Sequence, residues 1–373
     1  MTLEIPTNLL PRDGRFGAGP SKVRAEQLQA IVASGSPMGT SHRKPAVKDI
    51  VASIRDGITK LYGLPEGYEV LLGNGGASAV WDMIPFCLVE ENAQCAVIGE
   101  FSGKAARAVE RAPWLPEPQI RRVEPGGMIE CESAPATAEE PAVDTYIYAH
   151  NETSTGALTP LRRFGDSEAL TIVDGTSAAG GVLVDPSNVD FYYFSPQKNF
   201  ASDGGLWLAF ASPAAIERIE HLTSERWVPD FLNLKIALDN SRKDQTLNTP
   251  ALATLIMLDN QVQWMLANGG LAAMDERART SSDLVYAWAE ALPDATTFIA
   301  DPAFRSSVVT TIDFEYTVDT AAVTRELRAN GIVDIEAYRS LGRNQFRIAT
   351  FAAVDSEDIA KLLSCIDWVI DNI

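Results

Sequence analysis

The sequence LTIVDG at residues 170–175 is followed, after an intervening segment, by VDFYYFSPQKN at residues 189–199. Each begins with a short apolar run rich in β-branched or aromatic residues, which indicates a buried strand. The first strand ends at Asp174, and Lys198 closely follows the second. A residue that leaves the end of a parallel strand faces the crevice in which α/β sheets bind ligands. The two stretches therefore predict a lysine and a carboxylate on neighbouring strand ends.

The same pattern of apolar runs and helical stretches extends through the first two thirds of the chain. Strands separated by helical crossovers predict an α/β fold with a mostly parallel sheet covered by helices. The segment from residue 112 to 143, rich in Pro, Glu and Ala, is expected to be a long surface connection with one short strand. The expected strands are residues 69–72, 95–98, 145–149, 170–173, 189–194 and 206–211.

Turn and cap residues set the expected helices. Pro20 suits the first position of a helix that runs to Ile31. Thr249 is a suitable N-cap for a long helix from Pro250 to the Gly269-Gly270 break, and another helix follows to about Leu292. In the remainder, strands are expected at 308–314, 332–335 and 345–349, and helices at 320–329 and 356–370.

These elements predict two domains. A large domain is expected over residues 16–259, and a smaller α+β domain over residues 260–373. Residues 1–15 are expected to join the smaller domain. A length of 373 residues, with 46% hydrophobic and 22% charged residues, suits a globular protein of this kind.

The chain is strongly acidic, with 31 basic and 50 acidic residues and a formal net charge of −19. Such a field repels nucleic acid and anionic membranes, so neither is expected as a partner. If the substrate is an anion, the site must concentrate arginines locally. No leader-like pattern is found in residues 1–14, and no apolar run approaches the ~18 residues that a membrane span requires.

The four cysteines show neither metal-binding nor redox spacing. They are interpreted as small buried hydrophobes in a reducing compartment, so we expect a cytoplasmic protein without a metal site. The cysteines are Cys87, Cys95, Cys131 and Cys365.

A glycine-rich turn is a third candidate feature, in addition to the lysine and the carboxylate. Residues 73–78, GNGGAS, follow the strand at 69–72 and open a helix. Backbone N–H groups and the dipole of such a helix start can hold a phosphate. Pyridoxal 5′-phosphate (PLP) needs a lysine amine, a carboxylate opposite its pyridine nitrogen, a phosphate cradle and a flat group against its ring.

Blander interpretations exist for each residue alone. A single lysine is more often a solvated loop residue, an aspartate at a strand end is often a helix N-cap, and a glycine-rich turn can be only a turn. A dinucleotide fingerprint fits half of residues 73–78, but Ser78 replaces the third glycine. It also leaves Lys198 and Asp174 without a role.

Five motifs occur in the order and spacing of a known family. They are Ser41-His42-Arg43, Asn151-Glu152-Thr153, Asp174, Gln197-Lys198-Asn199 and Asn248-Thr249-Pro250. The set resembles the phosphoserine aminotransferases, which are class V aminotransferases of PLP fold type I, over nearly the whole chain from Phe16. The resemblance implies PLP as cofactor and a homodimer with shared active sites.

The resemblance also implies roles around the cofactor. Lys198 would form the Schiff base and carry the proton, Asp174 would pair with the pyridinium, and Thr153 would contact the phenolic oxygen of the ring. The phosphate would be held by Ala77, Ser78 and Gln197. Asn248 and Thr249 would reach the same phosphate from the other subunit, in addition to capping the helix at Pro250.

The implied reaction is reversible transamination between glutamate and 3-phosphohydroxypyruvate, which gives O-phosphoserine and 2-oxoglutarate in serine biosynthesis. A related phosphorylated keto acid would connect the protein to pyridoxine biosynthesis. His42 and Arg43 would approach the phosphate or the distal carboxylate. Arg347 would clamp the α-carboxylate, a planar group that suits a bidentate guanidinium.

The sequence departs from the family pattern twice. Phe101 stands where many relatives place a tryptophan, and we take it as the residue stacked on the ring. Tyr338-Arg339 is the nearest match to a His-Arg pair, but two extra residues precede Arg347. We therefore assign Arg339 to the second substrate anion, with Arg343 as the alternative.

Sequence features distinguish the expected function from three alternatives. An alanine– or serine–glyoxylate aminotransferase would have no use for His42 and Arg43. A cysteine desulfurase would need a nucleophilic cysteine in a Gly/Ser-rich loop, and none of the four cysteines lies in one. A binding protein that kept the fold but lost catalysis would not need Lys198 and Asp174.

Overall fold

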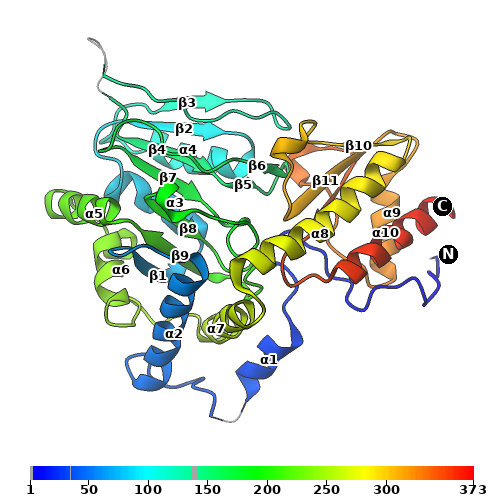
Figure 1. The fold of residues 1–373 in the computed structure, drawn as a ribbon, viewed down its shortest axis with the longest axis horizontal. Helices are drawn as coiled ribbons and strands as arrows, with labels where there is room; N and C mark the ends of the chain where they lie inside the picture. Colours follow the sequence, from blue (N-terminus) through cyan, green and yellow to red (C-terminus); the bar gives the residue numbers. More distant parts are fainter. Residues whose placement is uncertain (1–2, 34, 137–141) are drawn as a thin grey trace.

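The computed structural model describes residues 3–33, 35–136 and 142–373. A seven-stranded sheet forms the centre of the large domain (Figure 1). Its strands are β1 (Glu69–Gly75), β2 (Ala93–Val97), β3 (Gln119–Arg122), β4 (Thr145–Ala149), β7 (Leu170–Asp174), β8 (Phe191–Phe194) and β9 (Gly205–Ala211). Their order is β1-β9-β8-β7-β4-β2-β3.

The pairing from β8 through β3 is parallel, whereas β9 pairs antiparallel with both β8 and β1. The predicted α/β fold with a mostly parallel sheet is therefore confirmed. Among the described residues, no helix is both long and apolar enough to span a membrane.

Alternation along β8 shows why both faces of the sheet are covered. Tyr192 and Phe194 point into one apolar core, together with side chains of α2 and α7. Phe191 and Tyr193 point into the other, together with side chains of α3, α4, α5 and α6. A strand buried on both faces has no polar side to present to water. The helices of this domain are α1 (Ala25–Val32), α2 (Pro45–Tyr62), α3 (Ala77–Cys87), α4 (Glu100–Glu110), α5 (Pro213–Glu225), α6 (Leu234–Ser241) and α7 (Leu252–Ala267).

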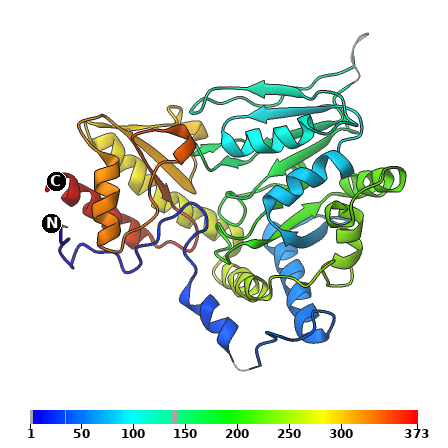
Figure 2. The ribbon, with the colours of Figure 1, turned by 180° about the vertical axis from the view of Figure 1, so that it is seen from behind.

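The small domain packs helices against an antiparallel three-stranded sheet in the order β10-β11-β12. Its elements are α8 (Gly270–Ala291), β10 (Ala295–Thr297), β11 (Val309–Phe314), α9 (Thr320–Ala329), β12 (Gln345–Ala349) and α10 (Ser356–Ile370). Ile5 and Phe16 belong to the core of this domain, and the N-terminal segment runs beside it (Figure 2). The short elements of the chain are β5 (Asn151–Glu152), β6 (Ala157–Leu158), η1 (Pro186–Asn188), η2 (Asp230–Leu232), η3 (Pro302–Phe304) and η4 (Arg339–Leu341).

Helix α7 crosses residue 260, where we expected the domain boundary. Leu255, Leu258 and Val262 of this helix belong to the same core as α2, so the whole helix packs on the large domain. The chain turns between the two helices at Gly269, which has a φ of 96° and precedes α8. We propose the boundary between α7 and α8, about ten residues later than the sequence suggested.

Three expected elements differ from the structure. Helix α1 begins at Ala25, because residues 17–24 instead bend at 18–20 and are bonded through Ser21 to Gln197 and Lys198. Helix α7 begins at Leu252 with Ala251 as N-cap, and the Thr249 hydroxyl lies 3.2 Å from His42 Nδ1 instead. Residues 332–335 form no strand, since Asp334 has a φ of 69° that interrupts the extended backbone.

Candidate active site

A cavity of about 290 Å³ lies at the carboxyl ends of β4, β7 and β8. Asp174 ends β7, and Lys198 follows β8 within four residues, so the parallel pairing brings both to one crevice, as the sequence predicted. Seven of the residues expected to hold the cofactor line this cavity. They are Ala77, Ser78, Phe101, Thr153, Asp174, Gln197 and Lys198.

Lys198 is buried with 7% of its surface exposed, and its Nζ donates a hydrogen bond to the Ala18 carbonyl at 2.5 Å. Burial, and secondarily the positive charge of Arg347, lowers the pKa of the Lys198 amine to about 7. Asp174 and Glu152 act in the opposite direction. A substantial share of the amine is therefore neutral at pH 7, which is the form that can attack a carbonyl group.

Asp174 is held by two donors. Its Oδ1 accepts from the Thr176 backbone N–H at 2.9 Å, and its Oδ2 accepts from Trp81 Nε1 at 3.1 Å. Sequence reasoning missed Trp81, although the spacing between Ala77 and Trp81 places both on the same face of α3. The two bonds fix a carboxylate that faces the cavity.

The glycine-rich segment forms a helix start as expected. Strand β1 ends at Gly75, which has a φ of 119°, and Gly76 is the N-cap of α3. A side chain added at Gly76 would have only Ser195 Oγ nearby, at 3.6 Å, so there is space in front of the first N–H groups of α3. Such a helix start binds anions.

Two further observations show that the residues around the cavity fit PLP. The Gln197 Oε1 and Thr176 Oγ1 atoms are buried there without any hydrogen-bond partner. Because buried polar groups are normally paired, these atoms indicate a polar ligand. The Phe101 ring centroid lies 5.7 Å from Lys198 Nζ and offers a flat apolar surface. An amine, a carboxylate, a helix start and an aromatic ring match the four needs of this cofactor.

A second hollow of about 430 Å³ adjoins the cavity, and both are lined by Gly19 and Pro20. Arg347 and Arg339 line this hollow. Arg347 Nη1 donates to the Thr153 carbonyl at 3.3 Å, while its buried Nε has no partner. Burial lowers the pKa of Arg347, and the unpaired Nε is suited to receive a carboxylate.

Arg343 is engaged elsewhere. Its Nη2 lies 2.6 Å from Asp313 Oδ2, and its guanidinium stands 4.4 Å from the centre of the Phe298 ring. The ion pair with Asp313 compensates the charge of Arg343, and Arg343 lines neither hollow. The geometry favours Arg339 over Arg343 for the second anion, and the role of Arg339 stays a prediction.

The remaining expected residues form a separate cluster. His42 Nδ1 lies 3.2 Å from Thr249 Oγ1, and Arg43 Nη2 donates to the Leu247 carbonyl at 2.9 Å. Asn248 lies beside them in the chain, and none of the four residues lines the cavity or the second hollow. Thr249 lies close to the glycine-rich turn, since its carbonyl accepts a hydrogen bond from Asn74 Nδ2 at 2.9 Å. A role of the four residues in the site of another subunit stays a prediction.

Residues 17–24, which we call the strap, cross the cavity between the two domains. Ser21 Oγ donates to the Lys198 carbonyl at 2.6 Å, and the Ser21 backbone N–H donates to the Gln197 carbonyl at 2.9 Å. A side chain at Gly19 would come within 2.5 Å of Lys198 Nζ. The strap thus covers the lysine and needs glycine at its closest approach.

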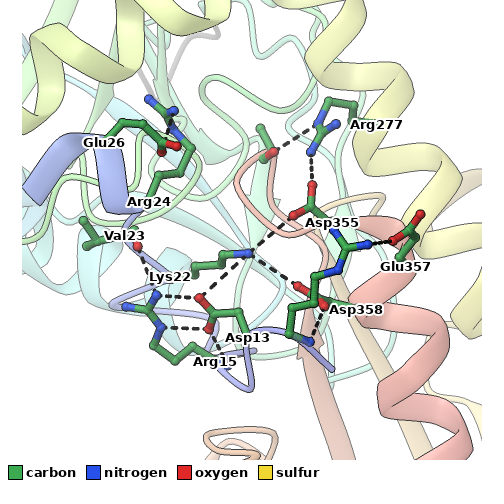
Figure 3. Close-up of polar contacts among 12 residues, drawn as sticks. Asp13, Arg15, Lys22, Val23, Arg24, Glu26, Arg277, Asp355, Glu357 and Asp358 are labelled. Carbon is green, nitrogen blue, oxygen red and sulfur yellow. Dashed lines mark hydrogen bonds and ion pairs between the residues drawn. The ribbon is translucent and has the colours of Figure 1, made fainter. Parts of the chain in front are cut away.

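Charged groups anchor the strap at Lys22 (Figure 3). The nearly buried Lys22 Nζ lies 3.5 Å from Asp358, 3.6 Å from Asp355 and 3.9 Å from Asp13. Arg24 Nε then donates to Gln261 Oε1 of α7 at 2.7 Å. The strap is therefore bound to the small domain at Lys22 and to the large domain at Arg24.

The four cysteines are all buried, unlinked and absent from the cavity lining. Burial raises the pKa of Cys87 and of Cys131 to about 12, so neither thiol is available as the nucleophile of a desulfurase. Within residues 3–33, 35–136 and 142–373 no group of His, Cys, Asp and Glu is arranged to hold a metal ion.

The fold and the cavity are those of a class-V aminotransferase, and the model of that family matches residues 17–337 of this chain. The chain is 55% identical over 371 residues to the phosphoserine aminotransferase of Corynebacterium glutamicum (strain R), with 99% of this chain and 97% of that protein covered. Within its class, this chain belongs to the phosphoserine aminotransferase family and is a PLP-dependent transaminase.

Solved structures agree on the fold. A phosphoserine aminotransferase from Cytophaga hutchinsonii superposes with a TM-score of 0.86 at 22% identity, covering 95% of this chain and 99% of that one. A PLP-bound phosphoserine aminotransferase from Trichomonas vaginalis gives a TM-score of 0.79 at 22% identity, with 95% and 100% covered.

Proposed function

We propose that this chain transfers the amino group of glutamate to 3-phosphohydroxypyruvate and produces O-phosphoserine and 2-oxoglutarate. The observation that carries the proposal is the pair of adjoining hollows, one with Lys198 and Asp174 and the other with Arg347 and Arg339. A substrate that enters the second hollow meets two arginines in a protein of net charge −19. The two carboxylates of this hollow, Asp334 and Glu336, are both paired with Arg328. Local arginines of this kind select small dianions against the repulsion of the whole molecule.

When bound, PLP supplies an electron-accepting ring next to the substrate amine. Lys198 would hold and return the proton of the substrate α-carbon. Asp174 would lie opposite the ring nitrogen, and Trp81 holds that carboxylate in place. Arg347 orients the α-carboxylate, and the strap limits the access of water to the lysine.

The active unit in this proposal is a homodimer in the cytoplasm. His42, Arg43, Asn248 and Thr249 would complete the phosphate and substrate sites of the other subunit, since they lie away from both hollows of their own chain. PLP should then stabilise the dimer by mass action. Sedimentation with and without PLP tests this, and a fully active PLP-saturated monomer would refute it.

The place of the reaction is serine biosynthesis, and pyridoxine biosynthesis through a related phosphorylated keto acid is a second proposed use. To test the main function, purified protein is incubated with O-phosphoserine and 2-oxoglutarate, or with alanine and glyoxylate, and glutamate or glycine is quantified. We expect turnover of the first pair and much slower turnover of the second. Preference for alanine and glyoxylate would favour the competing class V activity.

A further inference from the structure

The family motif Asn151-Glu152-Thr153 contains a carboxylate that the proposed chemistry does not use. Glu152 is fully buried in β5, with 0% of its surface exposed. It makes no ion pair with a basic side chain in the described part of the chain. A buried carboxylate without a counter-ion is strongly unfavourable unless hydrogen bonds compensate its charge.

Hydrogen bonds from two segments provide that compensation. Glu152 Oε2 accepts from the backbone N–H of Ser102 at 2.9 Å, from Ser102 Oγ at 2.8 Å and from the backbone N–H of Phe101 at 3.1 Å. Glu152 Oε1 accepts from Ser154 Oγ at 2.6 Å. The carboxylate is thus bonded to the first turn of α4 and to its own loop.

The first turn of α4 has free N–H groups because no preceding turn can accept them. Gly99, the N-cap, has no side chain that could accept a hydrogen bond from these N–H groups. Glu152 therefore caps α4 from a different strand, with a negative charge at the positive end of the helix dipole. A side chain at Gly99 would lie 2.5 Å from Glu152 Cγ, so the glycine makes room for this distant cap.

Phe101 is the residue of this capped turn whose side chain enters the site. Its ring lines the cofactor cavity, with its centroid 5.7 Å from Lys198 Nζ. The ring also meets Tyr338 edge to face at 5.5 Å, and Arg347 stands 5.2 Å from the Tyr338 ring. The position of α4 thus sets the aromatic wall between the cofactor cavity and the arginine of the second hollow.

We propose that Glu152 is a positioning residue whose carboxylate fixes the first turn of α4, so that Phe101 lies against the cofactor ring. The proposal rests on the assignment of Phe101 as the stacking residue. The Phe101 backbone N–H is shared between the two carboxylate oxygens, at 3.2 Å to Oε1 and 3.1 Å to Oε2. In Glu152→Gln an amide N–H₂ replaces one of these acceptors, so the first turn loses that half of the shared bond together with the negative charge at the helix start. Phe101 then loses its fixed orientation while the cavity keeps its other residues.

The test is a double-mutant cycle with Glu152→Gln and Phe101→Leu. PLP affinity is measured by titration of the cofactor-free protein, and visible circular dichroism reports the orientation of the bound ring. Loss of one ordered aromatic contact corresponds to about a tenfold weaker affinity. We expect each single variant to show about that loss with a changed dichroic signal, and the double variant to be little weaker than Phe101→Leu, because coupled residues are not additive.

Asp144→Asn is the matched control. Asp144 also caps backbone N–H groups, those of Glu91 at 2.7 Å and Asn92 at 2.6 Å, but it does not line the cavity. We expect this variant to lower the melting temperature and to leave PLP affinity and dichroism unchanged.

Additive losses, or a Glu152→Gln variant that only melts earlier, would overturn the proposal and leave Glu152 as an ordinary cap. If Phe101→Leu alone leaves PLP binding unchanged, the assignment of Phe101 fails, and the proposal fails with it for that separate reason. If Glu152→Gln does not fold, Ser154→Ala removes one donor to the carboxylate and replaces it in the cycle. An unchanged dichroic signal in Ser154→Ala with a lower melting temperature would likewise overturn the proposal.

Discussion

The neutral fraction of the Lys198 amine gives a prediction that can be worked out in numbers. Burial, and secondarily the charge of Arg347, lowers the pKa of Lys198 from 10.5 to about 7. At pH 7 about half of the amine is neutral, whereas an ordinary lysine would be neutral in roughly 1 molecule of 3,000. The site therefore gains on the order of a thousandfold in reactive amine.

The assay mixes cofactor-free protein with PLP in a stopped-flow instrument and follows the visible absorbance of the attached cofactor. Because only the neutral amine reacts, the rate should rise about tenfold per pH unit below a midpoint near 7 and level off above it. Nα-acetyl-lysine, measured in parallel, corrects for the ionisation of PLP itself. Its rate should continue to rise toward pH 10.5.

Arg347→Met is the informative variant. It removes a like charge but leaves the burial of Lys198, so the midpoint should move upward, though not to the value of a free lysine. A wild-type rate that still rises tenfold per unit beyond pH 9 would refute the reasoning. A downward shift in Arg347→Met would show that the charge of Arg347 acts through a different contact.

Three further predictions follow from the site. Asp174→Asn removes the charge opposite the ring nitrogen, so kcat should fall by about two orders of magnitude or more while PLP remains bound; unchanged kcat would show that this carboxylate does other work. Arg347→Ala should weaken the binding of every substrate by about 1.5–3 kcal/mol per lost hydrogen bond. Arg339→Ala should weaken the binding of O-phosphoserine far more than that of alanine. If Arg343→Ala shows this selective loss instead, Arg343 binds the second anion. Lys22→Met removes the cation beside Asp358, whose side chain is 4% exposed, whereas Asp13 and Asp355 keep their pairs with Arg15 and Arg277. We expect a loss of about 1–3 kcal/mol in urea unfolding. Arg12→Ala breaks a pair with 85% and 75% exposed side chains and should change stability by less than about 1 kcal/mol; equal effects would contradict the anchoring of the strap.

Local sequence patterns were enough to predict several strands and helices of this structure. Apolar runs ending at Asp174 and Phe194 identified two parallel strands, because burial on both faces excludes polar residues from their interiors. The strand order then placed Lys198 and Asp174 at one crevice without any knowledge of side-chain geometry. Helices α9 and α10 begin and end at the residues that the pattern predicted.

Contacts between distant segments could not be read in this way. The strap is not helical, because it contacts Lys198, nearly 180 residues away in the chain, and that contact overrides the helix signal of Pro20. Thr249 has the chemistry of an N-cap, but its hydroxyl meets His42. Trp81 gave no signal in the sequence, and Glu152 belonged to a family motif without an assigned role; the fold places them beside Asp174 and α4.

The most direct test of the central claim is to locate the cofactor bond. PLP-loaded protein is reduced with borohydride, digested and mapped by mass spectrometry for the phosphopyridoxyl group. The account predicts a single modified residue, Lys198, and no modification in Lys198→Ala. Modification of Lys104, whose amine also stands 5.1 Å from the Phe101 ring, with Lys198 unmodified, would contradict it.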